Sequence, residues 1–232
     1  METFKYETHL HTTEGSACAS ACAVDYIDVY KKIGYSGIFV TNHFFGGNTC
    51  VQKNISWEKR IEQYCKGYEL ACEACKNDKD FKVFFGIEQT FDGDDYLIFG
   101  LDKKWLLENP QIENMPLSEI FTCVNKIGGL IIQAHPFRLR DYIRAIHLHP
   151  RDVHAVEVFN GGNKIHENEL AALYAKNFNF PMTSGSDIHN IDLILNSPEK
   201  IGGVEFNSPL KDVFDFAKRI KLNQFKMIGG TM

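Results

Sequence analysis

The feature that most restricts the fold of this chain is the alternation of short apolar runs with longer helix-like stretches. Residues 37–41 (GIFVT) and 129–133 (GLIIQ) have the length and composition of buried strands, whereas residues 57–77 have the length and apolar spacing of a helix. Strands that alternate with helices are typical of a mostly parallel sheet, either open or closed into a barrel. The sequence therefore predicts an α/β fold.

The same criteria assign the rest of the chain. Strands are expected at residues 3–8, 37–41, 83–88, 96–101, 129–133, 155–159, 181–184 and 201–204. Helices are expected at residues 24–33, 57–77, 116–126, 165–177 and 209–220. The polar, Gly- and Asn-rich span 44–56 is expected to be a loop long enough to act as a lid. No repeat, low-complexity tract or linker divides the sequence, so one domain is expected over residues 1–232.

Composition and charge narrow the class of protein. The 232 residues are 44% hydrophobic and 24% charged, which is ordinary for a globular protein. A net charge of −5 predicts no basic surface for a long nucleic acid or an anionic membrane. No apolar run approaches the roughly 20 residues that span a bilayer, and residues 1–11 lack the pattern of a signal peptide. A cytoplasmic protein that acts away from membranes is expected.

The cysteines do not alter this expectation. The chain has seven, an odd number, and shows no sign of export to an oxidising compartment, so reduced thiols are expected. Cys72 and Cys75 form a CxxC near the end of an expected helix, but no second CxxC exists to complete a four-thiolate zinc site. Both are expected to be ordinary side chains of that helix.

Metal-competent side chains gather where the expected strands end. They are His9, His11, His43, Glu88, His135, Asp187 and His189. In parallel α/β folds these strand ends share one face, where active sites form. Residues i and i+2 of extended backbone point the same way, so His9 and His11 can bind one ion together, as can Asp187 and His189. Imidazoles combined with a bridging carboxylate such as Glu88 favour Zn, Mn or Fe over Ca.

A second HxH, at residues 147–149, is an internal control. No apolar strand precedes it and a proline follows it, so a surface loop or helix end is expected there. His154, before a strand, and His166, on a polar helix, are also expected to lie outside any site. A metal site is therefore predicted from the joint occurrence of polar residues at strand ends, and not from HxH alone.

Together the motifs resemble the signature of the polymerase and histidinol phosphatase (PHP) family. The matching segments are HLHT at 9–12, TNH at 41–43, GIE at 86–88, QAHPF at 133–137 and SGSDIH at 184–189. The resemblance implies a distorted seven-stranded (β/α)7 TIM-like barrel with two or three divalent metal ions. It also implies a metal-dependent phosphoesterase.

The resemblance further implies a ligand set for each metal. The first metal would be bound by His9, His11, Glu88 and Asp187. Glu88 would bridge to the second metal, which His135 would also bind. The third metal would be bound by His43 and His189.

The chain departs from the family pattern at three places. Asn42 replaces the usual Asp of the TDH motif, a position next to the ligand rather than a ligand. Many members place another His or Asp after the HxH, and here Glu14 is the expected oxygen donor, with Cys18 as the alternative. The His that usually joins the second metal corresponds to Asp95, which we favour over Asp94, although either acid can belong to a hairpin turn.

The expected chemistry is hydrolysis of a phosphate ester by metal-activated water, because clustered divalent ions lower the pKa of water and bind the oxygens of an in-line displacement. Glu88 and His189 are the expected catalytic side chains, and His189 either binds a metal or protonates the leaving group. Arg138 is expected to bind phosphate through two donors, the alternative being a surface arginine paired with an acid. Glu157 and Asn160 are expected to shape the site without binding metal.

Three functions remain open at this point. The first is a phosphatase or phosphodiesterase that acts on a small phosphorylated molecule, including a nucleotide, with histidinol phosphatase as one subtype. The second is a nuclease, although the acidic net charge and the absence of basic and aromatic stripes disfavour long nucleic acids. The third is a non-catalytic metal-binding module, which Asn42 and the lack of a further His after HLHT support.

Overall fold

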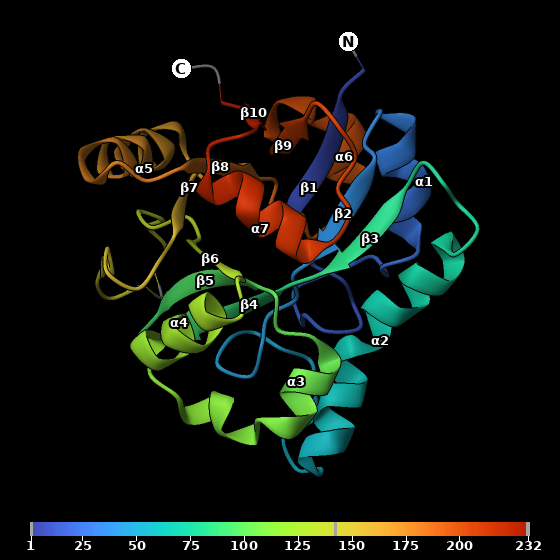
Figure 1. Ribbon diagram of the computed structural model, residues 1–232, viewed down its shortest axis with the longest axis vertical. Coiled ribbons are helices and arrows are strands. Elements are labelled where there is room, and N and C mark those ends of the chain that lie inside the picture. The colour runs from blue at the N-terminus through green and yellow to red at the C-terminus, as the bar shows by residue number, and fades with distance from the viewer. Residues whose placement is uncertain (1, 142, 231–232) are drawn as a thin grey trace.

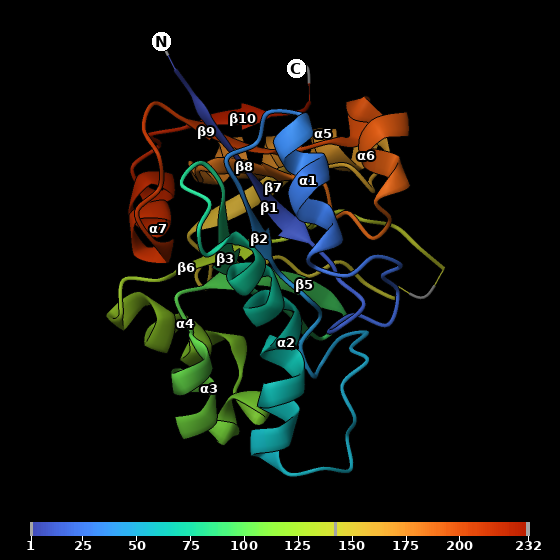
Figure 2. The ribbon, with the colours of Figure 1, turned by 90° about the vertical axis from the view of Figure 1, so that its right-hand side faces the viewer.

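The computed structural model describes residues 2–141 and 143–230. Two five-stranded sheets lie at its centre, with the strand orders β10-β9-β1-β2-β3 and β4-β5-β6-β7-β8. Helices pack around the strands, α1 on β2, α2 on β3, α4 on β6 and α5 on β7 (Figures 1 and 2). The expected α/β class is confirmed. Within the described residues, no helix has the length and apolar character needed to cross a membrane.

Each sheet combines parallel and antiparallel strands. The first contains β1 (Phe4–Leu10), β2 (Gly37–Val40), β3 (Lys82–Phe85), β9 (Gly203–Phe206) and β10 (Lys226–Ile228). The second contains β4 (Ile87–Phe91), β5 (Asp94–Phe99), β6 (Leu130–Gln133), β7 (Ala155–Asn160) and β8 (Met182–Gly185). Strands β1 to β3 and β6 to β8 are parallel, whereas β5 and β9 run antiparallel to their neighbours.

The antiparallel course of β5 follows from a tight hairpin. Asp92 and Gly93 join β4 to β5, and both have positive φ, 52° and 92°. Two residues in the left-handed region form the short turn that matches the twist of antiparallel strands. The expectation of a mostly parallel sheet fails here because two residues cannot make the long crossover that a parallel pair requires.

The helices follow the expected positions closely. They are α1 (Asp25–Lys32), α2 (Trp57–Cys75), α3 (Lys103–Glu108), α4 (Leu117–Lys126), α5 (Ile165–Phe178), α6 (Asp192–Asn196) and α7 (Val213–Lys221). Helix α2 begins after Ser56, whose hydroxyl accepts a hydrogen bond from the backbone N–H of Lys59, and Asp212 caps α7 in the same way. Helices α3 and α6 were not predicted, because they are too short to show a clear apolar period.

Both edges of the second sheet are linked to the first sheet. Single parallel bridges join Leu10 to Ile188 and His43 to Glu88. The strand expected at 83–88 is interrupted at Gly86, so that β3 belongs to one sheet and β4 to the other. A Cβ at Gly86 would lie 2.8 Å from Phe99 and 2.9 Å from Thr41, so only glycine allows the chain to cross between the sheets here.

Helix α7 covers one end of the strands. Its Phe216 is fully buried, with its ring centroid 4.4 Å from that of Phe39 on β2 and 5.1 Å from that of Phe99 on β5. Tyr6 and Leu130, near the starts of β1 and β6, belong to the same apolar cluster. Apolar packing therefore fills the end where the parallel strands begin, and the polar residues are left at the end where they finish.

Candidate metal centre

The HxH motif lies at the end of β1. The strand continues to Leu10, two residues beyond its expected end, so His9 is within it and His11 directly follows it. Both imidazoles are fully buried. Because they are two positions apart on extended backbone, they face the same interior.

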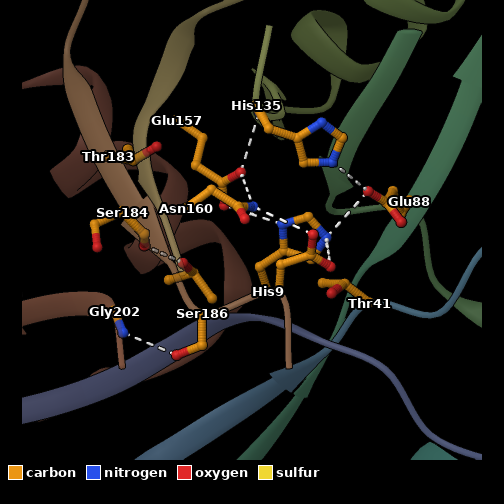
Figure 3. Close-up of polar contacts among 12 residues, drawn as sticks. His9, Thr41, Glu88, His135, Glu157, Asn160, Thr183, Ser184, Ser186 and Gly202 are labelled. Carbon is orange, nitrogen blue, oxygen red and sulfur yellow. Dashed lines mark hydrogen bonds and ion pairs between the residues drawn. The ribbon is translucent and has the colours of Figure 1, made fainter. Parts of the chain in front are cut away.

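Glu88, at the start of β4, contacts four imidazoles, of which Figure 3 shows those of His9 and His135. Its Oε1 is 3.0 Å from His9 Nε2 and 3.2 Å from His135 Nε2. Its Oε2 is 3.2 Å from His11 Nε2 and 2.7 Å from His43 Nδ1. One buried carboxylate therefore faces four imidazoles.

Asp187 completes this group from the segment after β8. Its Oδ1 is 3.4 Å from His9 Nε2 and 3.2 Å from His11 Nε2. The structure thus brings together the four residues expected to bind the first metal. Asp187 and His135 both have positive φ, 53° and 30°, a backbone conformation that costs about 1–3 kcal/mol for a residue other than glycine. Such strain is typical of residues whose side chains the surrounding structure holds in place.

The hydrogen bonds of the histidine rings fix which nitrogen faces the cluster. His9 Nδ1 is 3.0 Å from Glu157 Oε1, and His189 Nδ1 is 2.9 Å from the backbone oxygen of Asp187. Carboxylates and carbonyls only accept, so Nδ1 carries the proton in the neutral form of both rings. Their Nε2 atoms therefore present lone pairs, the arrangement that is common for metal-binding histidines.

Ser16 does the same for His11. Its hydroxyl is 3.0 Å from Asn42 Oδ1, to which it donates, and 2.9 Å from His11 Nδ1. Since that proton is already used, Ser16 accepts from His11 Nδ1–H, and Nε2 of His11 is left with its lone pair. Asn42 also accepts from the N–H of Thr12 at 2.7 Å, so it organises the loop after the HxH and does not enter the cluster.

Four buried atoms at this point have no hydrogen-bond partner among the described residues. They are His9 Nε2, His11 Nε2, His43 Nδ1 and Glu88 Oε2. A buried polar atom without a partner costs about 1–3 kcal/mol, so four that lie close together indicate that a ligand is missing here. Imidazole nitrogens and carboxylate oxygens are the ligands of Zn, Mn and Fe. The residues present therefore fit a metal.

The second group contains Glu88, Asp95 and His135, with one ligand atom of each within 4.8 Å of the others. His135 Nε2 is 3.8 Å from Asp95 Oδ2, and the Thr90 hydroxyl donates to Asp95 Oδ1 at 2.5 Å. Asp94 is instead 2.6 Å from His147 Nδ1, outside this group. The structure thus places Asp95, and not Asp94, beside the predicted second position.

The third group contains His11, His43 and His189, again with ligand atoms within 4.8 Å of one another. Cys18, His43 and His189 line one cavity. Burial raises the pKa of the Cys18 thiol, but the two histidines outweigh burial and lower it to about 6.

Glu14, which we expected to complete the third group, points elsewhere. Its carboxylate accepts from the backbone N–H of Ala23 at 3.2 Å and lies against Gly67 of α2. The expectation was therefore wrong about the direction of this side chain. The reason is that the loop after the HxH turns at Thr12 and carries Glu14 towards α2.

Arg138 is at the wall of the site. Its Nη2 is 2.5 Å from Asp187 Oδ2 and 2.7 Å from Asn160 Oδ1, and its Nε is 2.9 Å from Asn163 Oδ1. It is thus an arginine paired with an acid, as in the alternative interpretation, but the acid belongs to the cluster. Arg138 also lines a cavity of about 520 Å³, together with Cys18, His43, Gly47, Asn48, Thr90, Gly93, Asp95, Asp187 and His189.

Neighbouring charges lower the pKa values of the carboxylates and shift those of the histidines in opposite directions. Burial raises the pKa of Glu88 and Asp187, but the neighbouring histidines, and Arg138 for Asp187, hold both pKa values well below their usual range. Burial lowers the pKa of His43, yet Glu88 and Cys18 raise it to about 11. Burial and His43 lower the pKa of His11 to about 4. An ion bound by His43 would therefore have to displace its proton.

Glu157 lies behind His9 and His135. Besides its bond to His9, it accepts from the backbone N–H of His135 at 3.1 Å and from Asn160 Nδ2 at 2.8 Å. One ligand atom each of Glu157, His9 and His135 also lie within 4.8 Å of one another, so whether Glu157 only supports the site stays a prediction. A Cβ at Gly185 would lie 2.5 Å from Glu157 Oε1 and 2.5 Å from His9 Cβ, so glycine is required beneath this contact.

Two supporting residues were missed in the sequence. Glu7 is fully buried and ties β1 to the segment after β8: its Oε1 accepts from the N–H groups of Thr8, His9 and Ser186, each at 2.9 Å. The available signal for Glu7 was its position two residues before His9, which places it on the same face of the strand as His9 and His11. Ser16 had none, because its contacts depend on the path of a loop.

The control histidines lie outside the cluster. Residues 147–149 form a loop, where His147 pairs with Asp94 and His149 contacts the Tyr96 hydroxyl. His154 accepts a hydrogen bond from the N–H of Ile131, and His166 is exposed on α5. All seven cysteines are free, as expected.

Sequence comparisons give little information on function. No family model matches the chain. The uncharacterised protein MJ0417 of Methanocaldococcus jannaschii is 29% identical over 186 residues, which cover 72% of this chain and 77% of that protein.

Solved structures share the fold at low identity. A two-domain protein of Bacteroides vulgatus, which contains a predicted PHP-like metal-dependent phosphoesterase, matches 98% of this chain with a TM-score of 0.72 at 15% identity. This chain spans only 65% of that protein's length. A candidate metal-dependent phosphoesterase of Bifidobacterium adolescentis matches 98% of this chain and 97% of its own, with a TM-score of 0.56 at 14% identity. An amidohydrolase of Chromobacterium violaceum, with bound sulfate and no metal, matches 93% of this chain and 96% of its own, with a TM-score of 0.56 at 12% identity. The chain therefore has the fold of the PHP-like metal-dependent phosphoesterases, and the resemblance is confirmed at the level of fold.

Proposed function

We propose that this chain is a PHP-family phosphoesterase that binds two or three divalent metal ions and hydrolyses a phosphate ester of a small molecule or nucleotide. The convergence of four buried, unpartnered ligand atoms around Glu88 is the observation that supports this most directly. The shared fold adds to it. We also propose that residues 1–232 act as one domain and that the strands form a distorted seven-stranded barrel. In it β3 and β4 count as one strand, and the bridges at Leu10 and His43 close the ring.

The ligand assignment follows the three groups. We assign His9, His11, Glu88 and Asp187 to the first ion. Glu88, His135 and Asp95 are assigned to the second, and His43 and His189 to the third. The predominance of imidazole favours Zn, Mn or Fe over Mg and Ca.

The bound ions would supply Lewis acidity, which lowers the pKa of water and offsets the charge that develops at phosphorus. The side chains do the rest. Glu88 stays ionised and can orient water through whichever oxygen faces it. Arg138, held against Asp187 and Asn160 at the cavity wall, can donate to phosphate oxygens. The Nε2 of His189 can bind an ion or protonate the leaving group, since its Nδ1 is occupied by the Asp187 carbonyl.

The cavity favours a small substrate. Its volume of about 520 Å³ is in the range of ligand pockets for small molecules. Gly47 and Asn48 of the loop between β2 and α2 line it, so this loop is placed to cover a bound substrate. The net charge of −5 does not favour a nuclease of long nucleic acids.

The non-catalytic alternative loses one of its supports. Asn42 organises the loop after the HxH through Ser16 and Thr12, so its replacement of the usual Asp does not remove a ligand. Its hydrogen bonds instead help to hold the His11 lone pair towards the cluster.

Metal analysis and a substrate panel test the proposal. Protein purified without chelator should hold at least one transition metal per chain and hydrolyse phosphomonoesters or diesters. Glu88→Gln and His135→Ala should each lose at least about 100-fold in kcat/KM, because loss of a ligand exceeds the 10–100-fold effect typical of changes to residues that only support a ligand. His166→Ala, an exposed histidine on α5, is the matched control and should keep full activity. Unchanged activity in both site variants, or the absence of bound metal, would show that the assignment is wrong.

A further inference from the structure

A second hollow adjoins the cavity of the metal centre. It has a volume of about 540 Å³ and lies between the end of β4, residues 113–118 and residues 149–152, and we call it the outer hollow. Thr90 lines both spaces, Gly46 lines the outer hollow, and Gly47 lines the cavity. A Cβ at Gly46 would lie 2.8 Å from the backbone oxygen of Thr90, and one at Gly47 would lie 2.9 Å from Thr90 Oγ1. The wall between the two spaces is therefore thin, because only glycine lets the loop lie this close to Thr90.

One buried side chain at the outer hollow lacks a hydrogen-bond partner. Gln89, on β4, lines the hollow and is only 3% exposed, and its Oε1 has no partner among the described residues. The carboxamide lies at the wall of the hollow, because a Cβ at Gly46, which also lines it, would lie 3.2 Å from Gln89 Nε2. Buried acceptors are nearly always hydrogen-bonded in native proteins. This acceptor therefore indicates a ligand that brings a hydrogen-bond donor into the outer hollow.

The rest of the lining indicates which donor fits. Besides Gln89, acceptor-bearing side chains line the hollow, namely Asp92, Asn114, Ser118, His149 and Asp152. No lysine or arginine is among the described residues of this lining, so a second phosphate would find no cationic partner there.

An ammonium group finds little here either. Asp92 is exposed, and Glu113 already accepts from Arg60 at 2.7 and 2.8 Å. Apolar surface comes from Phe91, Met115, Pro116 and Leu117. Amide, carboxylate and hydroxyl groups beside apolar surface match the hydroxyls and C–H face of a sugar ring.

We propose that the outer hollow binds the leaving group of the substrate and that this leaving group is a sugar. This inference rests on the proposed phosphoesterase function and deepens it. The phosphate lies in the cavity of the metal centre, and a sugar hydroxyl donates to Gln89 Oε1. Water adds to phosphorus, the bond between phosphorus and the sugar oxygen breaks, and that oxygen takes a proton. Gln89 is then a specificity-determining residue, because a site built to bind a hydroxyl discriminates against an ester that lacks it.

Hydrolysis of matched esters by the full chain, loaded with Mn²⁺ or Zn²⁺, tests the proposal. The panel contains a pentose phosphate, a hexose phosphate, 2-aminoethyl phosphate and phenyl phosphate. Gln89→Met keeps the length of the side chain and removes the amide. We expect it to raise KM for the sugar phosphates about 10-fold with little change in kcat, and to leave both constants for phenyl phosphate unchanged. Gln224→Met, an exposed glutamine after α7, is the matched control and should change neither.

A second variant covers the case in which Gln89→Met disturbs the fold. Asn114, at the end of the short helix η1 (Pro110–Asn114), lines the hollow and is exposed, so Asn114→Ala should fold normally. We expect it to raise KM for the sugar phosphates about 3-fold and to leave phenyl phosphate unaffected. If Gln89→Met impairs phenyl phosphate equally, an unchanged KM in Asn114→Ala would overturn the proposal.

Saturation-transfer NMR gives a readout that does not depend on activity. A methyl glycoside without phosphate should receive saturation from chelator-treated wild type and Gln224→Met, and less from Gln89→Met. No transfer from the wild type, or a KM for sugar phosphates that Gln89→Met leaves unchanged, would overturn the sugar site and leave the phosphoesterase function standing. A rise in KM confined to 2-aminoethyl phosphate would also overturn it, because the hollow would then bind an amine. A metal-loaded chain that hydrolyses none of the esters would overturn both proposals.

Discussion

Replacement of Glu7 by glutamine tests how the buried Glu7 carboxylate stabilises the backbone around His9 and Ser186. Its Oε1 accepts from three backbone N–H groups, and its Oε2 accepts from the Tyr30 hydroxyl at 2.7 Å and from the Ser186 hydroxyl. In Glu7→Gln the amide oxygen can keep the three N–H groups, but the NH₂ group then faces both hydroxyls. Ser186 already accepts from the Gly202 N–H at 2.8 Å, so its freedom to adapt is limited.

The expected cost follows from this count. Two buried hydroxyl protons lose their acceptor, and each such loss costs about 1–3 kcal/mol, so Glu7→Gln should lower the free energy of unfolding by about 2–6 kcal/mol. Glu7→Leu would also strand the three N–H groups, and we expect it not to fold, because the total would approach the stability of about 5–15 kcal/mol that is typical of a domain.

Urea unfolding of chelator-treated protein near neutral pH measures the effect. Glu205→Gln, on the neighbouring strand β9, is the control: Glu205 is only partly buried, and its change should stay within about 0.5 kcal/mol. A Glu7→Gln protein as stable as the wild type would refute the reasoning, because it would mean that Glu7 already carries a proton and donates to one of these hydroxyls.

Three further predictions concern pH and metal. Burial and Lys221 lower the pKa of His154 to about 4, so its contribution to stability is complete above about pH 6.5 and is lost as the pH falls towards 4. When urea unfolding is measured at about pH 7.5 and again at about pH 5.5, His154→Asn should lose about 1 kcal/mol less stability than the wild type. Equal losses in the two proteins would contradict this prediction. Asp95→Asn should weaken one metal position at least about 10-fold in a Zn²⁺ titration while Asp94→Asn does not, and the reverse order would assign the ligand to Asp94. Because the pKa of His43 in the metal-free protein is raised to about 11, metal binding near neutral pH should release protons. Calorimetry in buffers of different ionisation enthalpy detects this release. Binding without proton release would show that the His43 proton is not displaced.

Several features of the site were predictable because they depend on the strands alone. The strand that carries His9 and His11, and the strands that precede His43 and His135, are short runs that the sequence marks clearly, and the carboxyl ends of parallel strands must share a face. Glu88 and Asp187 joined them by the same rule. The period of two in a strand also made the pairing of His9 with His11 predictable from their spacing.

Other features depended on how segments far apart in the sequence pack. The choice of Asp95 over Asp94 was fixed by a two-residue hairpin that reverses β5 and by the pairing of Asp94 with the loop at His147. Gly86 divides one expected strand between two sheets, since no other residue fits against Phe99 and Thr41.

The loop after the HxH shows most clearly what could not be predicted from the sequence. The sequence by itself placed the histidines, because strand direction and side-chain alternation are local rules that a short strand obeys. It did not show that Glu14 turns to Ala23, that Cys18 lines a cavity with His43 and His189, or that Ser16 orients His11. Only the tertiary structure decided these, because a loop has no period of its own and its course is set by the hydrogen bonds and packing partners that distant parts of the chain provide.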